Sequence, residues 1–576
     1  MAPMKKKTFF GCVRALVAAS IALLDVHASV IAGPGQISGS VRDSGGPVAG
    51  AIVRVQGTAI SAVSRSDGTF VIDGVDGETE VHLTGWAPGY YIGRSDVVDA
   101  GSEAVEIALA RHHITDDPTY RWILVDQSTG EDEGRGCAHC HSRSGTDLAF
   151  DLPVDEWRRD AHSRSGTNPR FLSMYFGTDL DENQSPITRY RMSREYGPSP
   201  IRPDPEDPYF GPGYRLDFPD TTGNCAACHM PMAAVEAPYG TDPSTAGEFG
   251  AEGIGCDFCH KIWRVRVDSR TGLPFPNTPG VLSFDLLRPG PGHQLFIGPL
   301  DDVAPGEDTY SALQRESALC APCHFATFWS TVVYGSYSEW LDSPYSDPVT
   351  GQTCQDCHMP NVGGDLFARP EAGGLVRDPA QIRSHLMPGA ADAELLRNTV
   401  EMTASARLTN DTFAVDVAIT NVGAGHYVPT DSPLRHLILV VHAVSAKGKP
   451  LELLAGERVP AWGGTGEPRD GAYAGLPGTI YARVLEELST HEAPTAAYWN
   501  PTRVESDNRI APLATATSSY TFEVSDPGND VVEIDVVLFY RRAFRSLMEL
   551  KGWDAPDVVM ARHTETIRIS NRGNEQ

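Results

Sequence analysis

Cysteine and histidine are rare in this chain of 576 residues, which contains 11 of the first and 18 of the second. Long apolar runs are also missing after residue 35, which argues against a membrane-spanning helix in that part of the chain. Acidic residues outnumber basic ones, 75 to 47, and the formal net charge is −28. This excess of negative charge makes nucleic acid and anionic membranes poor partners and would attract a basic partner protein.

The rare cysteines are not scattered along the chain. Ten of the eleven lie in five copies of Cys-x-x-Cys-His: Cys137-Ala-His-Cys140-His141, Cys225-Ala-Ala-Cys228-His229, Cys256-Asp-Phe-Cys259-His260, Cys320-Ala-Pro-Cys323-His324 and Cys354-Gln-Asp-Cys357-His358. This spacing is the attachment signature of c-type haem. Each thiol can add to one vinyl group of the porphyrin, and the histidine that follows then binds the iron as its proximal ligand. The motifs therefore predict five covalently attached haem c groups.

Zinc and disulfides are the alternative uses of paired cysteines. Zinc sites take Cys-x-x-Cys pairs in twos to complete four ligands, whereas five pairs is an odd number. Neither zinc nor a set of disulfides explains why a histidine directly follows every second cysteine. The pattern therefore favours covalent haem.

The first 28 residues are typical of a secretory signal peptide. Lys5-Lys6-Lys7 precedes a short apolar stretch, and Val26-His27-Ala28 offers a small-residue cleavage site. A lipoprotein interpretation at Cys12 is weak, because too little apolar sequence precedes that cysteine. Residues 1–28 carry a net charge of +3, so the rest of the chain carries −31. We expect export to the periplasm or the cell surface, with no transmembrane segment in the mature chain.

Residues 36–110 are expected to form a small β-sandwich. Side chains alternate at period two in Ile37–Val41 and Ala51–Val55, and glycine-containing turns separate the strands. The phrases Ser66-Asp-Gly-Thr-Phe70 and Ala87-Pro-Gly-Tyr90 resemble the carboxypeptidase regulatory-like domain. That resemblance implies a seven-stranded sandwich with a structural or docking role and no catalytic residues of its own.

Residues 111–398 hold all five motifs, are rich in proline and glycine, and lack long helical periodicity. Such a segment is expected to have little regular structure and short helices, with the porphyrins serving as its core. The phrases Trp157-Arg-Arg-Asp-Ala-His162 and Cys354-Gln-Asp-Cys-His-Met-Pro360 resemble the multihaem cytochrome c family. The branch that they resemble most is related to the tetrahaem cytochromes of hydroxylamine oxidation.

Residues 399–571 return to β structure. Alternation in Phe413–Ile419 and a second apolar run in Leu437–Val441 predict strands of a C-terminal β-sandwich. The loop Asn421–Thr430 is similar to a Gly-His-x-x-Pro-Thr segment of the multihaem family, which implies that His426 caps a haem. The expected fold class is thus multidomain, with a haem-packed region between two sandwiches.

Each haem needs a sixth ligand or keeps an open position, and this choice separates an electron carrier from an enzyme. His162 and His426 lie in phrases that supply distal ligands in the resembled family, whereas His293 and His385 lie on loops containing glycine or proline. These four are the strongest distal candidates. The fifth ligand stays open among the following residues: His112, His113, His139, His436, Met174, Met192, Met232 and Met387.

The leading functional hypothesis is an exported pentahaem cytochrome that passes electrons along mostly bis-histidine haems, with no substrate of its own. The first alternative is an oxidoreductase that acts on a small nitrogen or sulfur compound at one five-coordinate haem. The second is a subunit of an extracellular cytochrome filament, in which the β regions make the contacts between subunits. Redox partner proteins, basic ones in particular, are expected in the first case.

Overall fold

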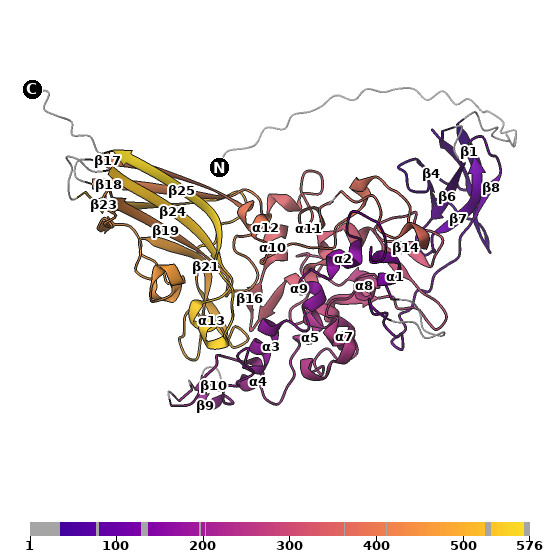
Figure 1. The fold of residues 1–576 in the computed structure, drawn as a ribbon. Helices are drawn as coiled ribbons and strands as arrows, with labels where there is room; N and C mark the ends of the chain where they lie inside the picture. Colours follow the sequence, from indigo (N-terminus) through magenta and orange to yellow (C-terminus); the bar gives the residue numbers. More distant parts are fainter. Residues whose placement is uncertain are drawn as a thin grey trace, which may run out of the picture.

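The computed structural model describes residues 35–76, 80–127, 136–194, 197–201, 203–204, 206–361, 363–409, 412–524 and 531–568. The expected signal segment, which includes Cys12, lies outside these residues. Figure 1 shows a β unit at each end of the molecule and a region of short helices between them. The coarse prediction of a β-rich chain of several parts with few, short helices is confirmed.

The N-terminal β unit, residues 35–110, contains two four-stranded sheets. One has the order β2-β1-β5, with β8 pairing β1 in parallel, and the other has the order β4-β3-β6-β7. Side chains from both sheets, among them Ile37, Val53 and Phe70, share one buried cluster. The strands are β1 (Gln36–Asp43), β2 (Gly46–Pro47), β3 (Ile52–Val55), β4 (Ser61–Val63), β5 (Thr69–Asp73), β6 (Glu80–Trp86), β7 (Gly93–Asp99) and β8 (Val105–Ala108).

The C-terminal β unit, residues 399–568, contains two antiparallel sheets. Their orders are β17-β18-β23-β20 and β22-β21-β19-β24-β25. Phe413, Val536 and Tyr520 belong to one buried cluster that contains side chains from both sheets. The elements are β17 (Val400–Thr409), β18 (Thr412–Asn421), β19 (His436–Ser445), β20 (Leu453–Ala455), β21 (Gly478–Glu487), β22 (Thr502–Asp507), β23 (Thr515–Glu523), β24 (Val531–Arg541), α13 (Arg545–Lys551) and β25 (Val558–Arg568).

The middle region, residues 111–398, consists of helices of at most eight residues and two-stranded ribbons. The helices are α1 (Ala138–His141), α2 (Pro153–Trp157), α3 (Pro169–Phe176), α4 (Tyr214–Asp217), α5 (Ala226–His229), α6 (Pro231–Ala234), α7 (Gly247–Ala251), α8 (Cys256–Cys259), α9 (Ala321–His324), α10 (Ser336–Leu341), α11 (Cys354–His358) and α12 (Ala393–Arg397). The ribbons pair β9 (Arg189–Ser193) with β10 (Gly197–Ile201), β11 (Ile262–Val265) with β12 (Phe284–Leu286), β13 (Phe296–Gly298) with β14 (Asp308–Tyr310), and β15 (Ala326–Phe328) with β16 (Thr331–Tyr334).

Polar contacts join the middle region to both β units. On the N-terminal side, Arg54 forms an ion pair of 2.7 Å with Asp301. On the C-terminal side, Arg509 pairs with Glu339 at 2.7 Å, and both side chains are less than a tenth exposed. Within the described ranges, no helix has the length and apolar character that crossing a bilayer requires.

Candidate functional site

Each Cys-x-x-Cys-His motif forms a single turn of helix, in α1, α5, α8, α9 or α11. In the first four of these turns, the backbone N–H of the histidine donates to the carbonyl of the first cysteine at 3.0 to 3.1 Å. Residues three positions apart share one face of a helix. The two thiols of a motif therefore lie on the same side of the turn, with the histidine directly after them.

The Nδ1 atom of every motif histidine lies next to an oxygen acceptor. In four cases this acceptor is a backbone carbonyl, and in the fifth it is a carboxylate. The pairs are His141 with Phe367 at 2.7 Å, His229 with Ser165 at 3.3 Å, His260 with Ile297 at 2.9 Å, His358 with Pro388 at 2.7 Å, and His324 with Oδ2 of Asp431 at 3.2 Å.

These acceptors determine which ring nitrogen is available to a metal. A carbonyl or carboxylate oxygen accepts, so the proton lies on Nδ1 and Nε2 keeps a lone pair in the neutral ring. Burial lowers the pKa of His229 to about 4 and keeps that ring neutral. Burial acts in the same direction on His324, but the hydrogen bond and charge of Asp431 raise the pKa of that ring to about 9. A metal at Nε2 of His324 would displace the second proton.

Two motif histidines face a second imidazole from elsewhere in the chain. The ring centres of His324 and His162 are 6.3 Å apart, and so are those of His358 and His426. An iron atom in line between two imidazoles, with each Fe–N bond about 2 Å long, separates the ring centres by about 6 Å. Both separations therefore leave room for one iron between the rings.

The loop that carries His426 approaches the middle region closely. A Cβ on Gly425 would lie 3.1 Å from the Tyr345 side chain and 3.2 Å from that of Trp340. The backbone N–H of Tyr427 donates to Glu339 at 3.1 Å. Glycine at position 425 thus permits the approach that brings His426 opposite His358.

His385, which lies outside the motifs, is near the motif histidines His260 and His141. Burial lowers the pKa of His385 to about 4, and the nearby rings of His260 and His141 act in the same direction, His260 more strongly. Its Nδ1 atom lies 3.1 Å from the carbonyl of Arg383, and its backbone N–H donates to Glu156 at 2.7 Å. The ring is therefore anchored, neutral and next to the α8 motif.

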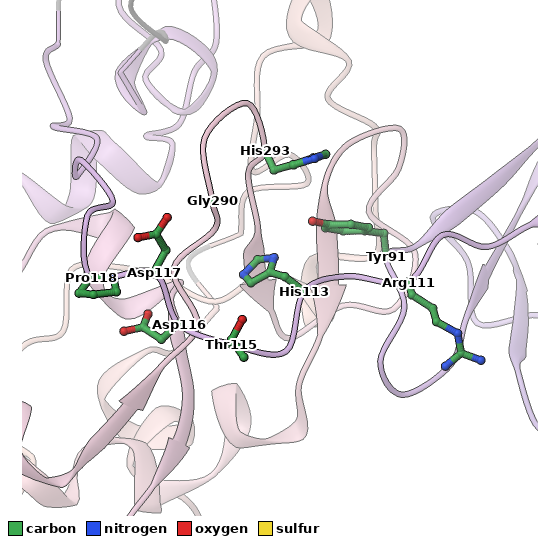
Figure 2. A pocket seen from close by; sticks show the side chains of 9 residues that line it. All are labelled: Tyr91, Arg111, His113, Thr115, Asp116, Asp117, Pro118, Gly290 and His293. Atoms are coloured by element: carbon green, nitrogen blue, oxygen red, sulfur yellow. The ribbon is translucent and has the colours of Figure 1, made fainter.

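His293 has a different environment, because its side chain is 66% exposed and its Nδ1 atom pairs with Glu307 at 2.8 Å. It lines a cavity of about 460 Å³ together with His113 and Arg111, and Tyr91 of the N-terminal β unit contributes to the same lining. Figure 2 shows His293 on the arched loop above His113. The structure thus brings together two distal candidates that the sequence places about 180 positions apart.

His112 and His113 share a feature of metal ligands. The Nε2 atoms of both are buried and, within the described part of the chain, have no hydrogen-bond partner. Buried polar atoms are otherwise almost always paired, so an unpaired imidazole nitrogen suits a ligand that is missing only its metal. Nε2 of His436 is also buried and unpaired there, but its ring packs against Trp462 and Phe544 inside the C-terminal β unit.

The remaining candidates differ in how far they are buried. His139 is exposed on α1. Met174 and Met232 are 7% and 3% exposed and belong to apolar clusters, whereas Met192 is 79% exposed. Met387 is half-buried, in the left-handed backbone region at φ 41°.

Contacts between thiols of different motifs reveal how the five turns are arranged. The contacting pairs are Cys137 with Cys256, Cys228 with Cys323, and Cys320 with Cys354. Cys259 of α8 also lies within electrostatic range of Cys320 and Cys323 of α9. The α9 motif therefore adjoins those of α5, α8 and α11, and the α8 motif in turn adjoins that of α1.

These residues fit haem c better than zinc. No three His, Cys, Asp or Glu side chains of the described ranges are gathered as a bare metal ion would require. Each turn instead presents two thiols and an anchored imidazole, which is the donor set of one covalent haem. The ten cysteines are all partly exposed and form no disulfide, so every thiol is available for attachment.

A cluster of tyrosines lies near the α5 motif, and no pattern in the sequence predicts it. Four phenols lie within electrostatic range of the Cys225 sulfur: Tyr175, Tyr214, Tyr334 and Tyr498. Burial raises the pKa of all four, that of Tyr498 to about 12, so they remain hydrogen-bond donors at pH 7. The hydroxyls of Tyr334 and Tyr498 are 2.9 Å apart, and the Arg435 guanidinium lies close to both.

The tyrosine cluster is harder to predict from the sequence than the two carboxylates beside His162 and His324, which are Asp160 and Asp431. Asp160, whose carboxylate lies 2.6 Å from Nδ1 of His162, stands two positions before it in the phrase Trp157–His162. Asp431 directly follows the Pro-Thr of the His426 loop. Both were within reach of sequence reasoning. The tyrosines come from four separate segments, and only the fold unites them.

No family model matches this chain, and no curated protein matches it either. Among solved structures, a penta-haem cytochrome c552 from Thermochromatium tepidum is 17% identical over 75% of this chain and 97% of its own, with a TM-score of 0.48. The Fcho1 Mu homology domain of Danio rerio with bound Eps15 peptide (7% identity, 30% of this chain and 44% of its own) and a PapD-like domain of human CEP192 (10%, 30% and 81%) have TM-scores of 0.11 and 0.10. Likenesses at these TM-scores establish neither a shared fold nor a shared function.

Proposed function

We propose that this chain is an exported multihaem c-type cytochrome that carries five covalent haem c groups and passes electrons between partner proteins outside the cytoplasm. The five motif turns would hold the porphyrins through their ten thiols, and the motif histidines would be the proximal ligands. When bound, the haems supply one-electron chemistry at the iron. The chain contributes ligands, close spacing of the sites and an insulating environment.

The observation that carries this proposal is the recurrence of one separation. Two motif histidines, distant in sequence from their partners, both face a second imidazole with ring centres 6.3 Å apart. His162 and His426 were distal candidates from the sequence, and the same spacing supports them as axial ligands. His385 is proposed as the distal ligand of the α8 haem, because the ring of His260 lowers the pKa of His385 more than the ring of any other motif histidine does.

Haem stoichiometry tests the proposal directly. The mature protein, produced with a c-type haem maturation system, is extracted with acidic acetone and weighed by intact-mass spectrometry. A mass increase of five haems that survives extraction is expected. Four or fewer covalent haems would refute the proposal, because all five motifs have the same local geometry.

Catalysis at the α5 haem is a second candidate function. The His229 ring stacks on Phe171 at 3.9 Å between centres, and His162, whose ring lowers the pKa of His229, already faces His324. The tyrosine cluster and Arg435 lie beside the same motif and could donate hydrogen bonds to a small anion. This arrangement favours an open iron at His229 as the site of an oxidoreductase.

Electron paramagnetic resonance separates the two candidates. A pure electron carrier gives five low-spin ferric signals, whereas an open α5 haem gives one high-spin signal that cyanide converts to low spin. Replacement of His229 by Ala should shift the g-values of that signal and leave the low-spin signals unchanged. Five low-spin signals in the untreated protein would exclude the catalytic candidate.

The roles of the two β units complete the proposal. The N-terminal unit is proposed to be a sandwich of the carboxypeptidase regulatory-like type that docks on the middle region through Arg54 and Asp301. The C-terminal unit is proposed to be a sandwich that supplies one axial ligand, His426. If the protein instead forms filaments, electron microscopy of the purified protein will show ordered polymers.

A further inference from the structure

The two histidine pairs have the same ring separation but different partners at Nδ1. In the His358–His426 pair, both Nδ1 atoms face backbone carbonyls, at 2.7 and 2.9 Å. In the His324–His162 pair, both face carboxylates: Asp431 at 3.2 Å and Asp160 at 2.6 Å. Among the five motif histidines, His324 alone faces a carboxylate.

Asp160 is a buried carboxylate with an ordered position. Its side chain is 2% exposed, and one oxygen accepts from both the backbone N–H and the Nδ1 atom of His162, at 3.0 and 2.6 Å. Within the described ranges, no lysine or arginine lies within ion-pairing distance of it. Its negative charge therefore acts on the His162 ring without a neighbouring cation to offset it.

Asp431 is held in position by its backbone as well as by hydrogen bonds. Its φ is 60°, in the left-handed region that aspartate and asparagine tolerate better than most residues. One carboxylate oxygen accepts from the Ser336 hydroxyl at 2.6 Å, and the other faces His324. Arg435 lies near this carboxylate and offsets part of its charge.

We propose that Asp160 and Asp431 make the haem between His324 and His162 the one with the lowest reduction potential of the five. This inference rests on the proposed function. A carboxylate that accepts the Nδ1 proton makes the imidazole a stronger electron donor to the iron, which favours the ferric state. Two negative charges in a medium of low dielectric constant favour the same state. Because Arg435 opposes only Asp431, Asp160 has the larger effect.

The haem between His324 and His162 would lie at the centre of the chain of haems, so its reduction potential would affect transfer between the haems around it. The α9 motif adjoins the motifs of α5, α8 and α11, as the thiol contacts described above show. Its haem would therefore be the junction of three arms. A low potential at the junction means that electrons at rest occupy the arms, and that each transfer between arms passes through the least stable reduced site.

Potentiometric titration of the intact protein with dithionite, followed by optical and EPR spectra, tests the inference. Asp160→Asn and Asp431→Asn should each raise the lowest of the five potentials, Asp160→Asn by more, and the double variant should raise it further. Asparagine keeps an acceptor for Nδ1 and tolerates the φ of Asp431, so the fold should persist. The matched control is Asp557→Asn, which removes a carboxylate paired with Arg541 in the C-terminal β unit and should leave all five potentials unchanged.

Ser336→Ala provides a test that keeps the charge. Loss of the hydroxyl leaves Asp431 free to bind His324 more strongly, so the lowest potential should fall. If the lowest potential moves in none of the three single variants while all five haems remain bound and spectroscopically unchanged, the inference is wrong and the proposed function stands. If the parent protein carries fewer than five haems, the proposed function fails first.

Discussion

The middle region and the C-terminal β unit differ in how they bury apolar surface. The C-terminal unit has a large buried core drawn from both of its sheets, with a smaller cluster on the outer face of one sheet. The middle region is longer but has several small clusters, and cysteines of the motifs, among them Cys259 and Cys323, lie at the edge of the largest one. Short helices with few apolar side chains cannot offset the entropy of ordering such a region. The difference fits a C-terminal unit stabilised by its own side chains and a middle region that would depend on the proposed haems for its core.

The largest expected effect follows from removing one haem attachment. Replacing both Cys256 and Cys259 with Ala should eliminate one haem and prevent the middle region from folding, because Phe258 between them is 2% exposed in the main cluster. Intact mass and the Soret absorbance per chain measure the loss. Val349→Ala is the control in the same region, since that side chain is 87% exposed and lies outside the motifs, and it should change neither quantity. A doubly substituted protein that folds normally with four haems would show that the middle region does not need all of its haems in order to fold.

A core substitution in the C-terminal β unit should lower the stability of that unit, because its own side chains form its core. Phe413 is fully buried, and Phe413→Ala should lower the free energy of unfolding of that unit by about 3–5 kcal/mol. Val559→Ala, at a site 38% exposed, should change it by less than about 0.5 kcal/mol. Denaturant titration followed by circular dichroism gives both values. Equal effects of the two substitutions would contradict the assignment of the core.

The C-terminal unit contacts the middle region through the loop that carries His426. A substitution at this residue tests whether the C-terminal unit supplies a ligand to a haem. His426→Met should leave five haems attached and raise one reduction potential, because a thioether replaces an imidazole at the iron. His442→Met on β19 is the control in the same unit and should leave every potential unchanged. An unaltered voltammogram of His426→Met would remove His426 from the ligand set.

The smallest effect on the haems is expected from removing residues 36–110. This β unit has its own core and no attachment motif, so the shortened chain should retain five haems and their spectra. Thr309 is 1% exposed and donates to the carbonyl of Tyr90, so some loss of stability near β14 should accompany the removal. Loss of a haem would mean that Tyr91 and its neighbours at the cavity help to hold one.

Local chemistry was readable from the sequence wherever it lies within a few consecutive residues. The five motifs, their one-turn helices and the period-two strands such as Phe413–Ile419 all depend on side chains at short fixed spacings, so the sequence alone predicts them. The β-rich architecture with short helices followed from the same patterns. The sequence offered His293 as a distal ligand and His113 as one option for a fifth, but it could not anticipate that both line one cavity, because about 180 residues separate them.

The tertiary structure decided every relation between distant segments. It placed His162 opposite His324 and His426 opposite His358, set carboxylates beside the first pair and carbonyls beside the second, and made the α9 motif the meeting point of three others. The sequence alone predicted five haem sites and the residues that begin them. Which imidazole faces which, and with what charge behind it, depends on how the chain packs, because no local pattern encodes the separation of residues far apart in sequence.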